Sequence, residues 1–448
     1  MRSFRELAIC RRGPVRTEPR ASASELTLTL CFLATSCAFA QPPMKLTLRE
    51  AEDLALKNHP LISAAAFQVL ASGQVTTEIQ SAYQPVINGN FTSGGAINNS
   101  RIQAGGLNNP IIYNRVATGV FGSQLIADFG RTASLVESSK LRTESQEQLV
   151  KATRAQVVLI ANQAYYSVLR ALAVLRVAQQ TVASRQLTAD QVKALADSKL
   201  KSGLDVSFTN VNLAESKLLL SSARNQERAA SAGLAAALGL PATHTFELAD
   251  EPLAQIEPPA IVEQLLKEAA ANRPELASLR LEVSAARKFA EAEGRLSRPT
   301  LAALGAAGVS PAHDEKLTSR YAAVAVNLSI PVFNGHLFSA RREEAELRSR
   351  VIEERVKDLE NSIARDVAIA ALNVETARER IDLTAQLLLH AARALDLAEQ
   401  RYSLGLSSAI ELSQAQLNKT SAEIQNITAG YDYRLQKSIL DFHAGVIR

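Results

Sequence analysis

The chain has 448 residues, of which 21% are charged, 47% hydrophobic and 5% aromatic, and its formal net charge is +4. This apolar content and low net charge exclude a disordered chain. Residues 41–448 hold 43 basic and 42 acidic side chains, and they form no basic stripe of the kind that binds nucleic acid. Few aromatic residues with abundant Ala, Leu, Glu and Arg predict long helices rather than a thick hydrophobic core.

The first forty residues have the features of a signal peptide. An Arg-rich segment, 2–20, precedes an apolar run, 26–39, and the small-x-small sequence that ends at Ala40 predicts cleavage there. All three cysteines lie in this region: Cys10, Cys31 and Cys37. The rest of the chain therefore has no disulfide and no cysteine metal site. An alternative is a lipoprotein signal in which Cys37 is acylated. Both alternatives predict export.

The rest of the chain repeats itself. Asn58-His59-Pro60-Leu61 corresponds to Asn272-Arg273-Pro274-Glu275, at an offset of 214 residues. Two halves with the same order of elements indicate a duplication. We expect a first repeat over 41–245 and a second over 246–448. Each would contain a short helix, a longer helix, a strand pair, a very long helix, a turn and a long helix.

The longest predicted helices cover about 131–201 and 336–402. Apolar residues recur every three or four positions along the second, and neither helix contains proline. About 67 residues at ~1.5 Å each give a helix ~100 Å long. Shorter helices would lie end to end beside each long one, 60–83 with 206–238 in the first repeat and 275–297 with 408–445 in the second. The narrow apolar stripes predict a wall of antiparallel helices.

The strand pairs, at about 86–127 and about 299–333, carry the pattern of a transmembrane barrel. Residues 321–333 alternate between apolar and small or polar side chains, and most of the strand segments contain no charged residue. The predicted lipid-facing positions are Val324, Val326, Leu328 and Ile330. The predicted lumen-facing positions are Asn88, Asn90, Thr92, Asn327 and Ser329.

Four strands cannot close a barrel, and an open edge in lipid leaves backbone groups without hydrogen bonds. The chain must therefore oligomerise if these strands enter a membrane. Two copies would give eight strands with a filled interior, whereas three copies would give twelve and an open lumen. The alternative is a soluble hairpin appended to a coiled coil.

These features together resemble the TolC family of outer-membrane efflux proteins. The most specific match is 402–416, which is similar to the family's periplasmic turn and entrance, and the resemblance covers about residues 44–446. It implies an α+β membrane protein, a homotrimer with a long α-helical barrel continued by a twelve-stranded β-barrel in the outer membrane. It also implies the exit duct of a tripartite efflux or type I secretion system, with a periplasmic adaptor and an inner-membrane pump as partners.

No enzyme site is predicted. The six histidines are scattered without the spacing of metal ligands, so we expect no metal and no cofactor. Asp128-Phe129-Gly130 resembles a kinase motif, but its companions are missing. It is better explained as a turn from strand to helix, with Phe333-Asn334-Gly335 as its counterpart. A periplasmic coiled-coil adaptor or structural protein remains the alternative function.

The resemblance places the periplasmic entrance at Glu411, Gln414, Tyr402 and Ser407. Under threefold symmetry, Glu411 would form a ring of three carboxylates that favours cations. The second acidic position of better-known members is Gln414 here, and Ser407 stands where some members carry a locking arginine. Alternatively, Glu411 is an ordinary solvated residue.

The turns between the long helices are the other predicted functional feature. Gly203 and Gly405 would allow each chain reversal, because glycine readily adopts a left-handed conformation. The tips of the helix pairs are exposed and repeated, so we expect them to contact the adaptor.

Overall fold

The computed structural model describes residues 44–94, 115–244, 246–250, 261–312 and 318–447. They belong to one compact unit, 42–448. The predicted signal peptide and the alternative acylation of Cys37 lie outside the described residues.

Eight α-helices in the described part of the chain form two series with equal lengths of 11, 21, 67 and 35 residues. The first series is α1 (Leu48–Asn58), α2 (Pro60–Gln80), α3 (Arg131–Asp197) and α4 (Gly203–Ala237). The second is α5 (Val262–Asn272), α6 (Pro274–Gly294), α7 (Leu337–Ser403) and α8 (Ala409–His443). Pro60 and Pro274 stand at the first position of their helices, where no backbone N–H is needed.

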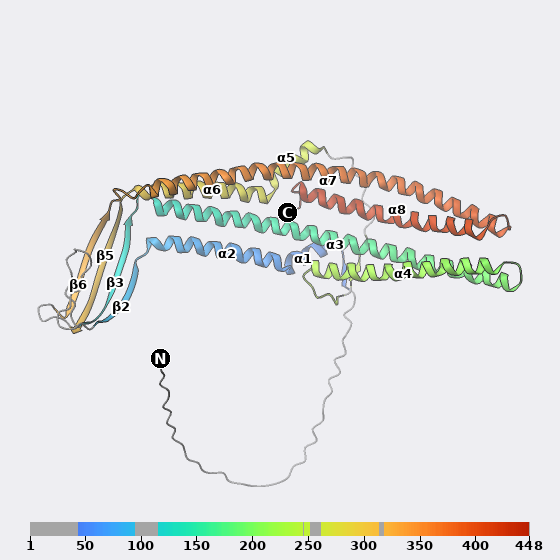
Figure 1. Ribbon diagram of the computed structural model, residues 1–448, viewed down its shortest axis with the longest axis horizontal. Coiled ribbons are helices and arrows are strands. Elements are labelled where there is room, and N and C mark those ends of the chain that lie inside the picture. Colours follow the sequence, from blue (N-terminus) through green and yellow to red (C-terminus); the bar gives the residue numbers. More distant parts are fainter. Residues whose placement is uncertain (1–43, 95–114, 245, 251–260, 313–317, 448) are drawn as a thin grey trace, which may run out of the picture. The chain divides into compact units, whose positions relative to one another are not determined.

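The helices lie side by side in a fixed order, as Figure 1 shows. Near the strands the order is α2, α3, α6, α7, and at the other end α4 and α8 take the places of α2 and α6. The expectation that two shorter helices accompany each long one is therefore confirmed. The predicted apolar stripe of α7 is buried in its first half, at Ile363, Val367, Ala370 and Ala377, whereas Ala385 and Ala392 farther along it are exposed.

The central position of α3 explains its apolar character. This helix holds an 18-residue window long and apolar enough to cross a membrane. Half of that window is buried within the protein. Since α3 has α2 and α4 on one side and α6 and α8 on the other, it needs apolar side chains on more than one face.

The largest core cluster surrounds the middle of α3 and includes a strand pair that the sequence analysis missed. β1 (Met44–Leu46) pairs in parallel with β4 (Phe246–Leu248). Tyr165 of α3 is buried beneath them and donates its hydroxyl to the carbonyl oxygens of Leu46 and Ala249, at 3.1 and 2.6 Å. This contact joins the beginning of the chain to its middle.

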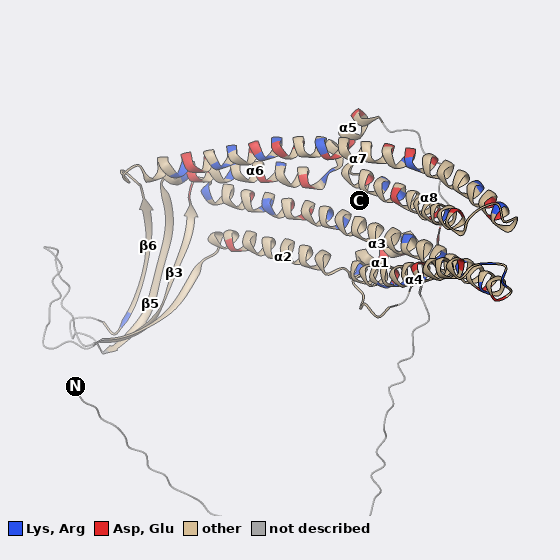
Figure 2. Ribbon diagram, turned by 45° about the vertical axis from the view of Figure 1, so that its right-hand side comes forward, with Lys and Arg blue, Asp and Glu red and all other residues tan. Residues whose placement is uncertain are grey.

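The other strands form one antiparallel sheet in the order β2-β3-β5-β6. Their bounds are Val86–Gly94 (β2), Arg115–Ala127 (β3), Thr300–Ala312 (β5) and Arg320–Ser329 (β6). Charged residues are concentrated on the helices, as the colours of the ribbon in Figure 2 show. The strands contain only two, each at the first position of its strand, Arg115 and Arg320.

The strand register places the polar residues predicted on β2 and on β6 on the same face of the sheet. Asn88 pairs with Phe121, which pairs with Ala306, and Ala306 pairs with Ala323. Because paired residues of an antiparallel sheet point to the same side, the two predicted polar sets share one face. This polar face includes Asn88, Asn90, Thr92, Asn327 and Ser329. Val324, Val326 and Leu328 lie on the opposite face, with Ile87 and Phe91.

One predicted strand position was wrong. The alternation over 321–333 placed Ile330 in the strand, but β6 ends at Ser329. Pro331 has no backbone N–H to donate to a ladder, so the pairing of β6 ends before it. Phe333-Asn334-Gly335 follows and leads into α7, as expected.

A tyrosine lies across two glycines on the polar face of the sheet. Tyr321 pairs with Gly308, and Gly308 pairs with Gly119 on the next strand. A Cβ atom at either glycine would overlap the Tyr321 hydroxyl group. The glycines thus leave room for the ring to lie against the backbone.

We predict that Gly308→Ala destabilises the sheet. Its Cβ would lie 2.5 Å from the carbonyl oxygen of Thr118 as well as overlapping Tyr321. The free energy of unfolding should fall by about 1–3 kcal/mol, as for other overpacked sites. Thermal unfolding in detergent would measure it. Gly305→Ala is the matched control, because the nearest atom to its Cβ lies 4.0 Å away; equal effects would contradict the explanation.

Candidate functional site

Both pairs of long helices reverse direction through the same hydrogen-bonded turn. After α7, Gly405 adopts a left-handed conformation with φ of 75°, and the Leu406 N–H donates to the carbonyl oxygen of Arg401 at 2.8 Å. After α3, Lys199 takes the left-handed position with φ of 62°, and the Leu200 N–H donates to Leu195. Each is a Schellman ending of a helix.

Gly405 thus has the left-handed conformation expected of it at the turn, whereas the expectation of such a conformation at Gly203 was wrong. Gly203 lies at the predicted turn but is the first residue of α4, and its φ is not positive. The chain reversal instead uses Lys199, three residues after the last alanine of α3. A sequence pattern cannot easily identify such a residue, because the left-handed conformation costs a lysine more than a glycine.

The helices after the two turns begin with similar caps but use their acidic residues differently. Ser202 and Asp205 form a complete capping box, and the hydrogen bonds from Ser202 lower the pKa of the Asp205 carboxyl. Ser408 accepts the N–H of Glu411 at 3.2 Å. The Glu411 carboxylate does not return to the cap but lies 3.6 Å from Nη1 of Arg401. It is 44% exposed, so ions in solution can reach it, although the Arg401 guanidinium offsets part of its charge.

Tyr402 joins the two turns. The Nζ atom of Lys201 lies 3.9 Å from the centre of the Tyr402 ring, which is a cation–π contact. The hydroxyl groups of Tyr402 and Ser407 are buried without a hydrogen-bond partner among the described residues. The predicted closing residue Tyr402 thus contacts a lysine of the same chain. Gln414 is exposed, and its side-chain amide donates to Asn418 of its own helix.

The sequence analysis missed a buried arginine near the end of α3, close to the turns. Arg185 of α3 is 7% exposed and donates a hydrogen bond to Gln416 of α8. Burial lowers the pKa of its guanidinium, against the attraction of Glu215. The sequence did hold a signal for this burial. Arg185 lies four and seven residues before Ala189 and Val192, so all three share one face of the helix, and all three are buried. The bond fastens α8 to α3.

A hollow of about 720 Å³ lies between the two turns and is lined from α3, α7 and α8. Tyr402, Gly405 and Lys201 line it, whereas Glu411, Gln414 and Ser407 do not. Among the described residues, no group of three His, Cys, Asp or Glu side chains could hold a metal ion. The groups gathered here are a lysine on an aromatic ring, an exposed carboxylate and an arginine. Such groups suit a surface that binds a partner protein or conducts ions.

Comparisons with known proteins agree with this architecture. A family model described as outer membrane efflux protein matches residues 52–240 and 265–445. A comparison with curated protein sequences finds no significant match.

Several solved structures share the fold. A membrane protein from Pseudomonas aeruginosa matches with a TM-score of 0.76 and 20% identity, over 89% of this chain and 93% of that one. VceC, an outer membrane protein of Vibrio cholerae, matches with a TM-score of 0.74 and 15% identity, over 89% and 96%. The CmeC outer membrane channel of Campylobacter jejuni matches with a TM-score of 0.73 and 16% identity, over 89% and 85%.

The family match covers most of the chain, and the structural matches span nearly the whole described unit. The resemblance noted in the sequence is confirmed. The chain belongs to the outer membrane efflux protein family, a family of outer-membrane channels that extend into the periplasm.

Proposed function

We propose that three copies of this chain form the exit duct of a tripartite efflux or type I secretion system. The proposal rests on one observation: in the described part of the single chain, the outer strands of the sheet and the outer helices of the layer have no neighbour on one side. The sheet ends on β2 and β6, and the helix layer ends on α2 and α4 at one side and on α7 at the other. Joining β2 of one copy to β6 of the next would satisfy the backbone groups of both strands.

Pairing β2 with β6 of the next copy also assigns an environment to each face of the sheet. Twelve strands enclose an open lumen, toward which we assign Asn88, Asn90, Thr92, Asn327 and Ser329. Val324, Val326 and Leu328 would then face lipid, together with Ile330 just beyond β6. Val324 is 88% exposed in the single chain, and its apolar side chain needs a non-aqueous neighbour.

The equal helix lengths of the two series support an origin by duplication, with repeats over 41–245 and 246–448. The duct would be passive, with energy supplied by an inner-membrane pump, and it would carry out no catalysis. We assign the adaptor contact to the two turns around Gly203 and Gly405, and the entrance to Tyr402, Ser407, Glu411 and Gln414.

The free face of α2 supports association between copies. Thr76 packs against α3 through a 2.8 Å hydrogen bond with Ser139. Phe67 lies nine residues earlier, or about two and a half helical turns, so it points away from α3. It is 68% exposed, and Leu70 beside it is 63% exposed. An apolar edge of this kind is suited to pack on another chain.

We predict that Phe67→Lys weakens the trimer roughly tenfold or more, because it places a charge in the proposed interface. Multi-angle light scattering or native mass spectrometry in mild detergent would measure the oligomeric state. Val75→Lys is the matched control, since Val75 is exposed on α2 but lines a hollow shared with α3, α6 and α7. A wild-type protein that stays monomeric, or a Phe67→Lys protein that remains fully trimeric, would contradict the proposal.

We also predict opposite effects from the two charged residues at the entrance. An exposed carboxylate stabilises a nearby cation by on the order of 0.5 kcal/mol. Glu411→Gln should therefore lower the cation-to-anion permeability ratio about twofold. Arg401→Gln removes the guanidinium beside Glu411 and should raise the ratio.

Reversal potentials of single channels in planar bilayers under a salt gradient would measure both changes. Glu375→Gln, in the middle of α7, serves as the control for an exposed carboxylate away from the turn. Unchanged selectivity in Glu411→Gln, or changes of the same sign in the two variants, would count against the assigned role.

A further inference from the structure

The two series of elements correspond residue by residue. α2 and β2 begin 214 residues before α6 and β5, whereas α3 and α4 begin 206 residues before α7 and α8. The strand pairs fit the same two offsets, because Val86 pairs with Ser123 as Thr300 pairs with Ser329. A residue of α2 or β2 therefore has its counterpart 214 positions later, and a residue of β3, α3 or α4 has its counterpart 206 positions later.

The contact at the centre of the chain joins the two series. β3 pairs with β5, and α3 packs against α6. The counterparts of these four elements are β6, β2, α7 and α2, which are the outermost elements of the described sheet and of the helix layer beside it (Figure 1). If β6 and α7 of one copy met β2 and α2 of the next, the junction would repeat a contact that the chain already makes within itself.

We propose that neighbouring copies meet in the register of this internal contact. The proposal rests on the proposed association of three copies, and it states which residues touch across each junction. Wherever a residue of β3 or α3 contacts one of β5 or α6, their counterparts make the matching contact between copies. The offset of 206 gives the residue on β6 or α7, and the offset of 214 gives the residue on β2 or α2.

In the sheet, this register brings similar side chains together across the junction. Asn327 would pair with Thr92 of the next copy, and Leu328 would pair with Phe91. The first pair is polar and the second apolar, and such pairs stabilise neighbouring strands. A slip of one residue would instead place a polar side chain opposite an apolar one. The internal pairs from which these two follow are Phe121 with Ala306 and Gly122 with Gly305.

Along the helices, a pair of serines in the internal contact is replaced by two apolar residues. Ser145 and Ser278 are buried and share a hydrogen bond of 2.8 Å. Their counterparts are Val351 of α7 and Ala64 of α2, and both are exposed in the single chain. In the proposed register these two side chains cover each other, which removes apolar surface from water.

An ion pair of the internal contact is replaced in the same way. Arg131 lies 3.7 Å from the buried side chain of Glu293. The counterparts are Leu337, which is 48% exposed in the single chain, and Ile79. No charge has to be desolvated when these two residues meet, so the junction between copies would form at a lower cost than a copy of the ion pair.

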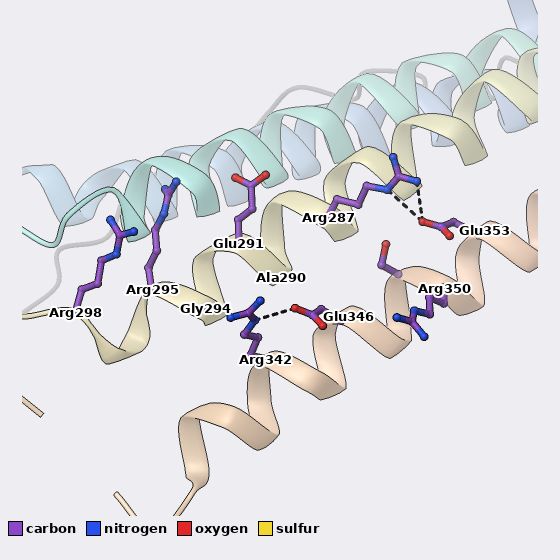
Figure 3. A pocket seen from close by; sticks show the side chains of 11 residues that line it. Arg287, Ala290, Glu291, Gly294, Arg295, Arg298, Arg342, Glu346, Arg350 and Glu353 are labelled. Atoms are coloured by element: carbon purple, nitrogen blue, oxygen red, sulfur yellow. Dashed lines mark hydrogen bonds and ion pairs between the residues drawn. The ribbon is translucent and has the colours of Figure 1, made fainter. Parts of the chain in front are cut away.

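The composition of α2 supports a covered surface. α6 contains seven charged residues, and some of them pair with the next helix, such as Arg287 with Glu353 at 2.8 Å (Figure 3). α2 has the same length and packs against α3, yet it contains one charged residue, Glu78. A helix with one side in water ordinarily carries charged side chains there. The uncharged side of α2 therefore fits a surface that another copy covers.

The test is disulfide cross-linking of the full-length protein in its membrane. Ala64→Cys combined with Val351→Cys should link copies to one another, which gives covalent dimers and trimers on non-reducing gels. Ser145→Cys combined with Ser278→Cys is the internal counterpart and should form its link within one chain. Since the natural cysteines all precede residue 41, peptide mass spectrometry distinguishes the engineered links from any others.

Ala64→Cys combined with Asp358→Cys is the matched control. Asp358 is exposed on α7 seven residues after Val351, and therefore about two turns farther along the same side. Because a disulfide needs Cα atoms within about 7 Å, this pair should cross-link roughly tenfold less. Leu328→Cys combined with Phe91→Cys tests the sheet separately and should also link copies.

Native mass spectrometry in mild detergent separates failure of the register from failure of the duct. A trimer that forms neither the Ala64–Val351 link nor the Phe91–Leu328 link would overturn the register and leave the duct standing. So would a trimer in which Ala64 cross-links to Asp358 as readily as to Val351. A monomer would overturn the duct, and the register with it.

Discussion

Backbone hydrogen bonding at the edges of the sheet constrains the whole molecule. β2 and β6 each have one edge without a partner in the single chain. In water such an edge can be solvated, but in lipid every unpaired N–H or C=O group costs several kcal/mol. The helix layer ends on the elements that follow or precede these strands, α2 and α7. One association between copies can therefore complete the sheet and the helix layer together.

A helix layer only one element thick also explains the composition of the chain. Its helices meet along narrow seams, where small side chains allow close approach. Several seams are held by hydroxyl groups, including Ser145 with Ser278 at 2.8 Å and Ser138 with the carbonyl oxygen of Ala285 at 2.7 Å. Alanine and serine thus form the helix–helix contacts that large aliphatic residues form in a globular core. The scarcity of aromatic residues follows from the same geometry.

The sequence predicted the elements well and their endings less well. The long helices and the strand faces follow from periodicity, which extends over many residues and tolerates single exceptions. The errors at Ile330 and Gly203 arose at chain reversals, where one residue decides the backbone path. The pairing of β1 with β4 joins two three-residue segments, too short for a pattern. The burial of Arg185 depends on which helices become neighbours, and only the tertiary structure supplies that information.

The two turns illustrate how a repeated architecture can acquire different properties at each copy. In both, a serine caps the helix and an acidic residue follows three positions later. At the first turn the carboxylate of Asp205 is engaged in the capping box, where hydrogen bonds from Ser202 stabilise its negative charge. At the second turn the carboxylate of Glu411 lies 3.6 Å from Arg401, which offsets part of its charge, and its 44% exposed side chain is in contact with solvent. Lys201 of the first turn meets Tyr402 of the second, which links the two reversals. If the entrance is controlled at these turns, its charge depends on the few residues in which the halves differ rather than on the helices that they share.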